Sequence, residues 1–201
     1  IHKSFNFGRA KGKYIAICDV DDYWIDSYKL QKQVDFLENN HKYSLVCTNS
    51  LIINFNGDFV RNRFNFKSDL DFDFEYLLNQ NHITTCTTLF RNFDMSNLTT
   101  QNLNFVDKFI WLTLLSNGKC RYMNSITSAY RVHEKGIYSS LKEYSKSIKR
   151  IEDYKFYRKV FPAYANIFSK KIFKNLIFGL VSSIKRGKFK SFIHLLKIYF
   201  G

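Results

Sequence analysis

The feature that most limits the possible folds is a short apolar run followed directly by acids. Residues 14–18 (Tyr-Ile-Ala-Ile-Cys) carry no charged side chain, and Asp19, Asp21 and Asp22 follow within four positions. An unbroken apolar run that contains Ile and Tyr is typical of a strand buried on both faces. Ligands bind at the carboxyl ends of strands in open α/β sheets. We therefore expect the three acids at a binding edge of the sheet.

The spacing of these acids favours a bound cation. Three carboxylates this close repel one another unless a positive group lies among them, and Mg²⁺ or Mn²⁺ with oxygen ligands would meet that need. Asp-rich turns and helix N-termini also use carboxylates to accept backbone N–H groups, without any metal. The triplet alone leaves both interpretations open, and the flanking sequence has to decide.

That flanking sequence carries a family resemblance. Residues 11–24 read KGKYIAICDVDDYW, and residues 29–34 read KLQKQV. Together they resemble the family 2 glycosyltransferases. The resemblance implies an inverting enzyme of the GT-A fold, in which an Asp-x-Asp motif holds a metal ion and a nucleotide sugar. It also implies that Asp21 and Asp22 are metal ligands and that Asp19 and Trp24 bind substrate.

Two later segments match positions of the same family. Asp107 opens a predicted helix four residues before a Trp-Leu pair, and residues 130–133 read Tyr-Arg-Val-His. The resemblance implies that Asp107 is the general base, that His133 is a third metal or diphosphate ligand and that Arg131 binds substrate. From the residues alone, the helix dipole also explains an acid in a first turn. A single His after a strand is likewise compatible with a structural role.

The resemblance implies metal-assisted transfer of a sugar from a nucleotide-sugar donor, a UDP-sugar above all. The implied acceptor is a saccharide or a lipid-linked molecule, as in bacterial surface polysaccharide synthesis. A metal-dependent phosphodiesterase is a rival interpretation, which would use the same carboxylates and a second metal about 4 Å away. A degenerate transferase, or a non-catalytic basic module that binds a membrane or nucleic acid, is also compatible with the sequence. The sequence contains no Walker loop and no Gly-x-Ser-x-Gly motif that would indicate another chemistry.

Length and composition fit one folded domain with an appendage. The chain has 201 residues, of which 45% are hydrophobic and 18% aromatic, so it can bury one core. Its four dispersed cysteines match neither a zinc site nor a disulfide scaffold, and indicate free thiols in a reducing compartment such as the cytoplasm. Residues 1–140 are expected to form the C-terminal portion of a GT-A-like α/β domain, a Rossmann-like sheet with flanking helices. We expect this portion to lack most of the nucleotide-binding half.

Residues 141–201 are expected to form a basic helical extension. They contain 15 Lys+Arg and 3 Asp+Glu, a net charge of +12, whereas residues 1–140 carry 16 and 14, a net charge of +2, which together give the +14 of the chain. Basic residues alternate with Ile, Leu and Phe at helical spacing, which is typical of helices in an anionic membrane interface. The alternative is a basic helical pair packed on the domain. The spacing suits a membrane better than a surface that stacks nucleic-acid bases, so we expect a peripheral protein at the inner face of the cell membrane and no nucleic acid partner.

Hydrophobic periodicity and turn residues predict the remaining elements. A helix over residues 28–39 is expected to begin at an N-cap formed by Asp26 or Ser27. Residues 69–73 are expected to open a short helix that runs to residue 78. Further helices are expected at residues 106–117, 142–160 and 167–200. Strands are expected at residues 43–49, 51–55, 59–64, 83–90, 120–123 and 126–132, with a tight turn at Asn56-Gly57.

Overall fold

A computed structural model describes residues 9–93, 103–133, 141–185 and 189–200. The chain divides into two compact units. The first unit comprises residues 1–98 and 110–133, and the second comprises residues 99–109 and 134–201. The domain boundary expected at residue 140 stays a prediction.

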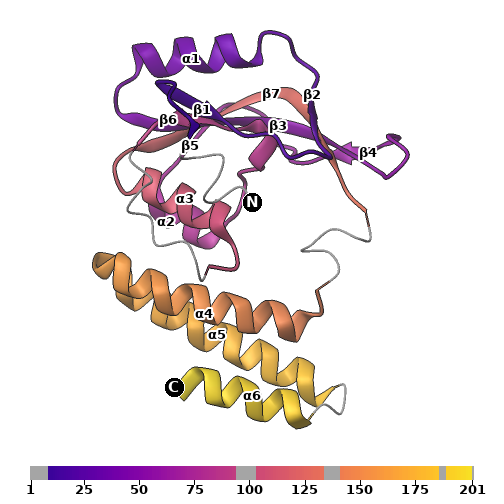
Figure 1. Cartoon of the computed structure of the whole chain (residues 1–201), viewed down its shortest axis with the longest axis vertical. Coiled ribbons are helices and arrows are strands. Elements are labelled where there is room, and N and C mark those ends of the chain that lie inside the picture. Colours follow the sequence, from indigo (N-terminus) through magenta and orange to yellow (C-terminus); the bar gives the residue numbers. More distant parts are fainter. Residues whose placement is uncertain (1–8, 94–102, 134–140, 186–188, 201) are drawn as a thin grey trace. The chain divides into compact units, whose positions relative to one another are not determined.

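A mixed sheet of seven strands forms the first unit (Figure 1). The strand order is β1-β6-β3-β7-β2, with β4 paired to β3 and β5 paired to β7. Among the described strands, β3 and β7 are the parallel pair, and the other pairs are antiparallel. The strands are β1 (Tyr14–Ala16), β2 (Tyr23–Trp24), β3 (Tyr43–Ile53), β4 (Phe59–Asn62), β5 (Leu70–Phe72), β6 (Leu89–Arg91) and β7 (Lys119–Arg131).

Helices cover both faces of this sheet. Helix α1 (Lys29–Asn39) lies on one face, and α2 (Phe74–Asn79) lies on the other, together with the part of α3 (Val106–Leu115) that belongs to this unit (Figure 1). Strand β3 lies between these layers, and nearly all of its residues are buried. This arrangement agrees with the expected α/β class, a partial GT-A-like sheet followed by C-terminal helices.

Strands β3 and β7 are longer than the strands predicted from the sequence. The strand predicted at residues 43–49 continues to Ile53 in β3. The two strands predicted at 120–123 and 126–132 are halves of the single strand β7. The register of β7 against β3 is irregular between Met123 and Ile126. This irregularity lies at the polar residues that the sequence places between the two apolar halves.

The apolar run before the acids is less buried than predicted. In β1 the side chain of Ile15 is buried, whereas Tyr14 and Ala16 are half-buried. Tyr14 and Ala16 pack against the cluster formed by Leu37, Tyr43, Val46 and Leu89, so that face of the strand is only partly covered. The predicted burial on both faces is thus complete for Ile15 and only partial for Tyr14 and Ala16.

Helix α1 packs on the sheet through Leu37, with Leu30 and Val34 partly buried beside it, as the apolar stripe predicted. The predicted N-cap is wrong, because Tyr28 occupies the cap position. Asp26 nevertheless organises this helix start, since its Oδ1 accepts a hydrogen bond from the backbone N of Tyr28 at 2.8 Å.

The acidic segment at residues 69–73 contributes to a strand and to the start of a helix. Residues Leu70–Phe72 form strand β5, which the sequence did not predict. Asp73 is the N-cap of α2, and its Oδ1 accepts a hydrogen bond from the backbone N of Tyr76 at 2.8 Å.

The predicted hairpin turn is confirmed, since Gly57 adopts a φ of 95°, a conformation that favours glycine. In the Thr-rich segment, a 3₁₀ turn η3 (Thr85–Thr87) precedes β6.

The second unit is helical. Its helices are α4 (Glu143–Val160), α5 (Ala165–Ile184) and α6 (Phe189–Phe200), and a 3₁₀ turn η4 (Pro162–Tyr164) joins the first two. Pro162 ends α4 as expected, because its ring cannot continue a helix from the preceding turn. Within the described residues, every helix is too short or too polar to span a bilayer.

Candidate active site

The predicted acidic motif forms a tight turn between β1 and β2. The backbone N of Asp22 donates a hydrogen bond to the carbonyl oxygen of Asp19 at 3.1 Å, and Val20 inside the turn is 99% exposed. Strand β2 follows at once and pairs with β7, with Tyr23 opposite Ala129. This pairing places the acids beside the carboxyl end of β7, where Arg131 is the last residue of the strand and His133 follows two residues later.

Three contacts join the two predicted motifs. The backbone N of Arg131 donates to Asp22 Oδ1 at 2.9 Å, and Arg131 Nε donates to the carbonyl oxygen of Asp21 at 3.1 Å. His133 Nε2 lies 3.3 Å from Asp21 Oδ2. The structure therefore brings together residues that are about a hundred positions apart in the sequence.

Asp22 is the most buried of the three acids, with 8% of its surface exposed. Burial raises the pKa of its carboxyl to about 6, although the hydrogen bond from the Arg131 backbone opposes that rise. Its Oδ2 is buried and has no hydrogen-bond partner among the described residues. The side chain thus has one oxygen bound to the backbone of β7, and the Cys86 thiol also interacts with this carboxyl and opposes the rise in its pKa.

Asp21 and His133 have donor atoms suited to a divalent cation. A carboxylate oxygen and an imidazole nitrogen suit Mn²⁺, and the carboxylate also suits Mg²⁺. Among the described residues, no group of three or more His, Cys, Asp or Glu side chains is placed to hold a metal ion. Magnesium in phosphate-binding sites commonly uses one or two carboxylates together with water and substrate phosphates. The pair therefore fits a cation that takes its other ligands from substrate and water.

Trp24 is fixed in position although it is 38% exposed. Its Nε1 donates a hydrogen bond to the carbonyl oxygen of Cys86 at 2.9 Å, and Lys29 Nζ lies 4.7 Å from the centroid of its ring. An amine at this distance is favourably placed over an aromatic face. The exposed part of the indole is therefore available as a rigid apolar surface.

The guanidinium of Arg131 binds the protein's own backbone. Besides the carbonyl of Asp21, it donates from Nη1 to the carbonyl oxygens of Asn54 at 3.0 Å and Phe55 at 2.7 Å. Arg131 thereby ties the turn after β3 to the acidic turn. Its predicted role as a substrate-binding residue stays a prediction.

Asp107 belongs to the second unit. It is the second residue of α3, it is exposed, and its Oδ1 accepts a hydrogen bond from the backbone N of Lys108 at 2.7 Å. Burial is the main factor that lowers the pKa of Lys108 to about 8. The structure thus places Asp107 where a first-turn acid was expected.

Sequence reasoning missed two polar residues beneath Trp24. Lys29 and Gln33 are almost fully buried, and Lys29 Nζ donates to Gln33 Oε1 at 2.9 Å. Gln33 Nε2 in turn donates to the carbonyl oxygen of Thr87 at 2.8 Å. The signal was present in the spacing, since residues 29 and 33 share one helix face with buried Leu37.

Comparison with known proteins gives three further findings. Residues 4–98 match the family model described as glycosyl transferase family 2. Uncharacterized proteins of Mycobacterium bovis and Mycobacterium tuberculosis are each 28% identical over 145 residues, which is 70% of this chain and 41% of each relative. The UDP-Glc:alpha-D-GlcNAc-diphosphoundecaprenol beta-1,3-glucosyltransferase WfaP of Escherichia coli is 32% identical over 125 residues, which is 62% of this chain and 47% of that protein.

The chain thus spans less than half the length of these curated relatives. The matched residues 4–98 contain the acidic turn, Trp24 and helix α1, which are the same features that carried the resemblance in the sequence. Through these residues the chain is similar to glycosyl transferase family 2, whose model matches a little less than half of it.

Proposed function

We propose that this chain takes part in the transfer of a sugar from a nucleotide-sugar donor, a UDP-sugar first of all, to a saccharide or lipid-linked acceptor. The observation that carries the proposal is the junction of the acidic turn with the end of β7, through the contacts of Asp21 and Asp22 with Arg131 and His133. A relative whose name states a UDP-glucose donor and a diphosphoundecaprenol acceptor supports the substrate classes. Synthesis of a bacterial surface polysaccharide is the process that we propose for it.

Asp21 and His133 would hold Mg²⁺ or Mn²⁺, with Asp22 as a further candidate ligand through its buried Oδ2. When bound, such a cation stabilises the negative charge that develops on the departing diphosphate. Asp19 is proposed to contact the ribose or the donor sugar. The exposed indole of Trp24 and the Arg131 side chain are proposed to line the substrate side of this edge.

Asp107 is proposed as the general base that takes a proton from the acceptor hydroxyl. The hydroxyl oxygen then forms a bond to the anomeric carbon, and the bond from that carbon to the diphosphate oxygen breaks. A single displacement of this kind inverts the configuration at the anomeric carbon. Asp107 is itself exposed in the first turn of α3, which is compatible with this role.

The products of nucleotide-sugar turnover test the proposal. We would incubate the chain with a panel of nucleotide sugars, Mn²⁺ and candidate acceptors, and separate the products by chromatography. Glycosyl transfer releases a nucleoside diphosphate, whereas a phosphodiesterase releases a nucleoside monophosphate and a sugar 1-phosphate. We expect the diphosphate, and we expect Asp107→Asn to abolish its acceptor-dependent formation. Release of the monophosphate, or unchanged turnover by the Asp107→Asn variant, would overturn the assignment.

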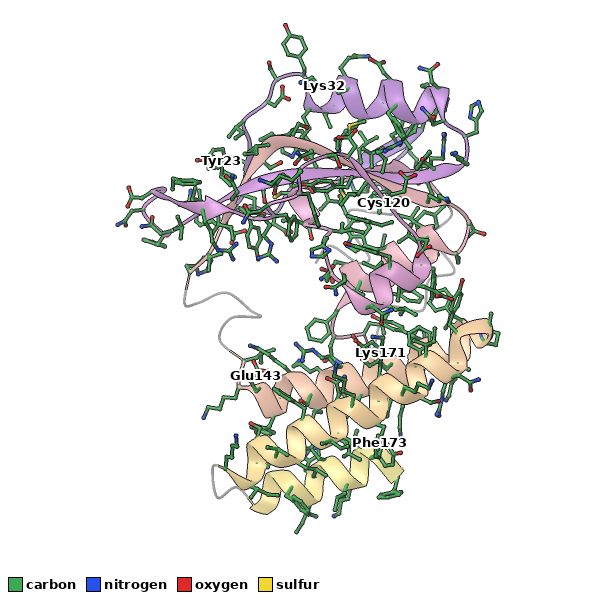
Figure 2. The ribbon with its side chains drawn as sticks, turned by 180° about the vertical axis from the view of Figure 1, so that it is seen from behind. Tyr23, Lys32, Cys120, Glu143, Lys171 and Phe173 are labelled. Atoms are coloured by element: carbon green, nitrogen blue, oxygen red, sulfur yellow. The ribbon has the colours of Figure 1, made fainter. Side chains whose placement is uncertain are left out.

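We further propose that α5 attaches the chain to an anionic membrane surface, at the inner face of the cell membrane. Exposed apolar residues recur on α5 at helical spacing, and they define a membrane stripe of Phe173, Ile177, Val181 and Ile184. Exposed lysines at 170, 174 and 185 lie close to the stripe on the same helix, because residues three and four apart share a face. Figure 2 labels Phe173 on this helix. An apolar stripe flanked by lysines complements an anionic lipid surface.

Sedimentation with lipid vesicles tests this attachment. We expect the chain to sediment with vesicles that contain phosphatidylglycerol and to be released by high salt. A double change of Phe173→Ser and Ile177→Ser should weaken sedimentation about tenfold or more, because it removes two large apolar groups from the interface. The matched control is Phe59→Ser, an exposed aromatic in the first unit. Equal sedimentation of the double variant and the control would contradict a membrane role for the stripe.

A further inference from the structure

The backbone just before α3 is held by side chains of α4. The backbone N atoms of Asn104 and Phe105 donate to the two carboxylate oxygens of Asp153, to Oδ1 and Oδ2 respectively, each at 2.9 Å. One helical turn further along α4, the hydroxyl of Tyr157 donates to the carbonyl oxygen of Phe105 at 3.1 Å. All of these residues belong to the second unit. We call Asp153 and Tyr157 the α4 clamp.

The two side chains of the α4 clamp are buried, and each makes defined contacts. Asp153 is 1% exposed and Tyr157 is fully buried. Burial raises the pKa of Asp153, while the hydrogen bonds from Asn104 and Phe105 oppose that rise. The ring of Tyr157 also stacks on Phe109, with centroids 5.7 Å apart and planes at 12°. A buried carboxylate that accepts two adjacent backbone N–H groups fixes the direction of the chain at that point.

The position that the α4 clamp fixes is the start of the helix that carries Asp107. The backbone N of Phe109 donates to the carbonyl oxygen of Phe105, so Phe105 is the residue from which α3 begins. Asp107 follows two residues later, in the first turn. A shift of the chain at Phe105 would therefore move the Asp107 carboxylate directly.

We propose that Asp153 and Tyr157 are positioning residues for Asp107. This inference rests on the proposed function, because it assigns the clamp to the general base of that reaction. Helix α4 lies beyond the residues matched by the family model, and its sequence predicted only an appended extension. The clamp instead makes α4 a part of the machinery that orients the base.

Kinetics of clamp variants test the proposal. Asp153→Ala removes both acceptors, Asp153→Asn keeps one acceptor oxygen, and Tyr157→Phe removes the hydroxyl but keeps the stacked ring. Small displacements of a catalytic group cost up to about a hundredfold in rate. We therefore expect kcat to fall about 10- to 100-fold in Asp153→Ala, with smaller losses in Asp153→Asn and Tyr157→Phe. The KM for the nucleotide sugar should stay within about twofold, because the residues proposed to bind the donor are left unchanged.

Glu152→Gln is the matched control. Glu152 precedes Asp153 on α4, and its Oε2 accepts a hydrogen bond from the Asn104 side chain at 3.1 Å in an exposed position. The substitution removes a charge next to the clamp and leaves an acceptor oxygen in place. Circular dichroism and thermal unfolding should show that the control and the Asp153→Asn variant remain folded. A kcat for Asp153→Ala and Asp153→Asn equal to that of the control would overturn the proposal.

Hydrogen exchange provides a readout that does not need activity. The amide hydrogens of Asn104 and Phe105 are the donors to Asp153, so they should exchange faster in both Asp153 variants than in the control. If the unsubstituted chain transfers no sugar in any assay, the proposed function fails, and exchange still decides whether Asp153 holds this segment. Unchanged exchange at residues 104 and 105 would overturn the clamp in either case.

Discussion

The indole of Trp24 donates a hydrogen bond from Nε1 to the carbonyl oxygen of Cys86, 62 residues further along the chain and 2.9 Å away. The same carbonyl also accepts a hydrogen bond from the hydroxyl of Ser128 on β7, at 3.0 Å. One backbone oxygen before β6 thus holds an aromatic residue of β2 and a hydroxyl of β7. The indole ring of Trp24 is therefore held in place by this hydrogen bond while part of its surface is exposed.

Loss of this ring should weaken substrate binding more than it slows the chemistry. We expect Trp24→Ala to raise the KM for a nucleotide sugar or an acceptor about tenfold, since stacking on an aromatic ring contributes about 1 to 3 kcal/mol. Trp24→Phe keeps a ring but lacks the N–H, so its effect should be smaller. Steady-state kinetics measure both. Tyr28→Ala, which removes another exposed aromatic nearby, is the control, and an equal effect there would argue against a role of Trp24 in binding.

The cation-binding prediction concerns Asp21 and His133. We expect Asp21→Asn and His133→Gln each to lower the affinity for Mn²⁺ in the presence of UDP by about tenfold or more, because each removes one proposed protein ligand of the cation. Isothermal titration calorimetry measures this affinity directly. Asp35→Asn changes an exposed acid on α1 and should leave the affinity unchanged. Equal affinity of all three variants would exclude this pair as the metal site.

A stability prediction follows from the hydrogen bond between Asp22 and the Arg131 backbone. Asp22→Ala leaves the N–H of Arg131 without its acceptor, and a buried donor left in this way costs about 1 to 3 kcal/mol. Asp22→Asn retains an oxygen that can accept the same bond and avoids burial of a charge. We therefore expect urea unfolding to show a lower free energy of unfolding for the Ala variant than for the Asn variant. Identical midpoints would mean that this bond contributes little to stability.

The pH dependence of stability should reveal the buried amine of Lys29. Burial lowers its pKa to about 8 from the ordinary value of 10.5. Between these two values the unfolded chain binds more protons at this residue than the folded chain, so its contribution to the free energy of unfolding rises with pH. Compared with Lys29→Met, the unsubstituted chain should gain stability between pH 8 and 10, by at most about 1.4 kcal/mol per pH unit. Parallel stability curves for the two proteins would contradict a lowered pKa.

Local patterns predicted most of the elements in the first unit. The apolar stripe on residues 30, 34 and 37 indicated α1, and Asn56-Gly57 indicated the turn in which Gly57 adopts a positive φ. These signals depend on residues that are neighbours along the chain. The resemblance added the pairing of Asp21 with His133, which are 112 residues apart and which no local pattern connects.

Several features depend on tertiary neighbours and could not be predicted from local sequence patterns. Lys29 is buried with its Nζ over the Trp24 ring and 3.5 Å from the carbonyl oxygen of Thr88, so its own position in α1 gives only a weak signal. Arg131 was predicted as a substrate ligand from its motif, yet its guanidinium donates to main-chain carbonyls that the motif does not contain. The strand Leu70–Phe72 forms by pairing with β7, against the helix-opening role that its flanking acids indicated.

The bond between Asp22 and Arg131 closes a loop of the chain across 109 residues. Closing so long a segment has an entropic cost, and contacts of high sequence separation slow folding. The proposed catalytic edge therefore cannot assemble from nearby residues, and its formation has to wait for the central strands to associate. Fluctuations that detach the two-residue strand β2 from β7 would dismantle this edge while β3 stays intact, so activity should be lost at a lower temperature than the sheet itself.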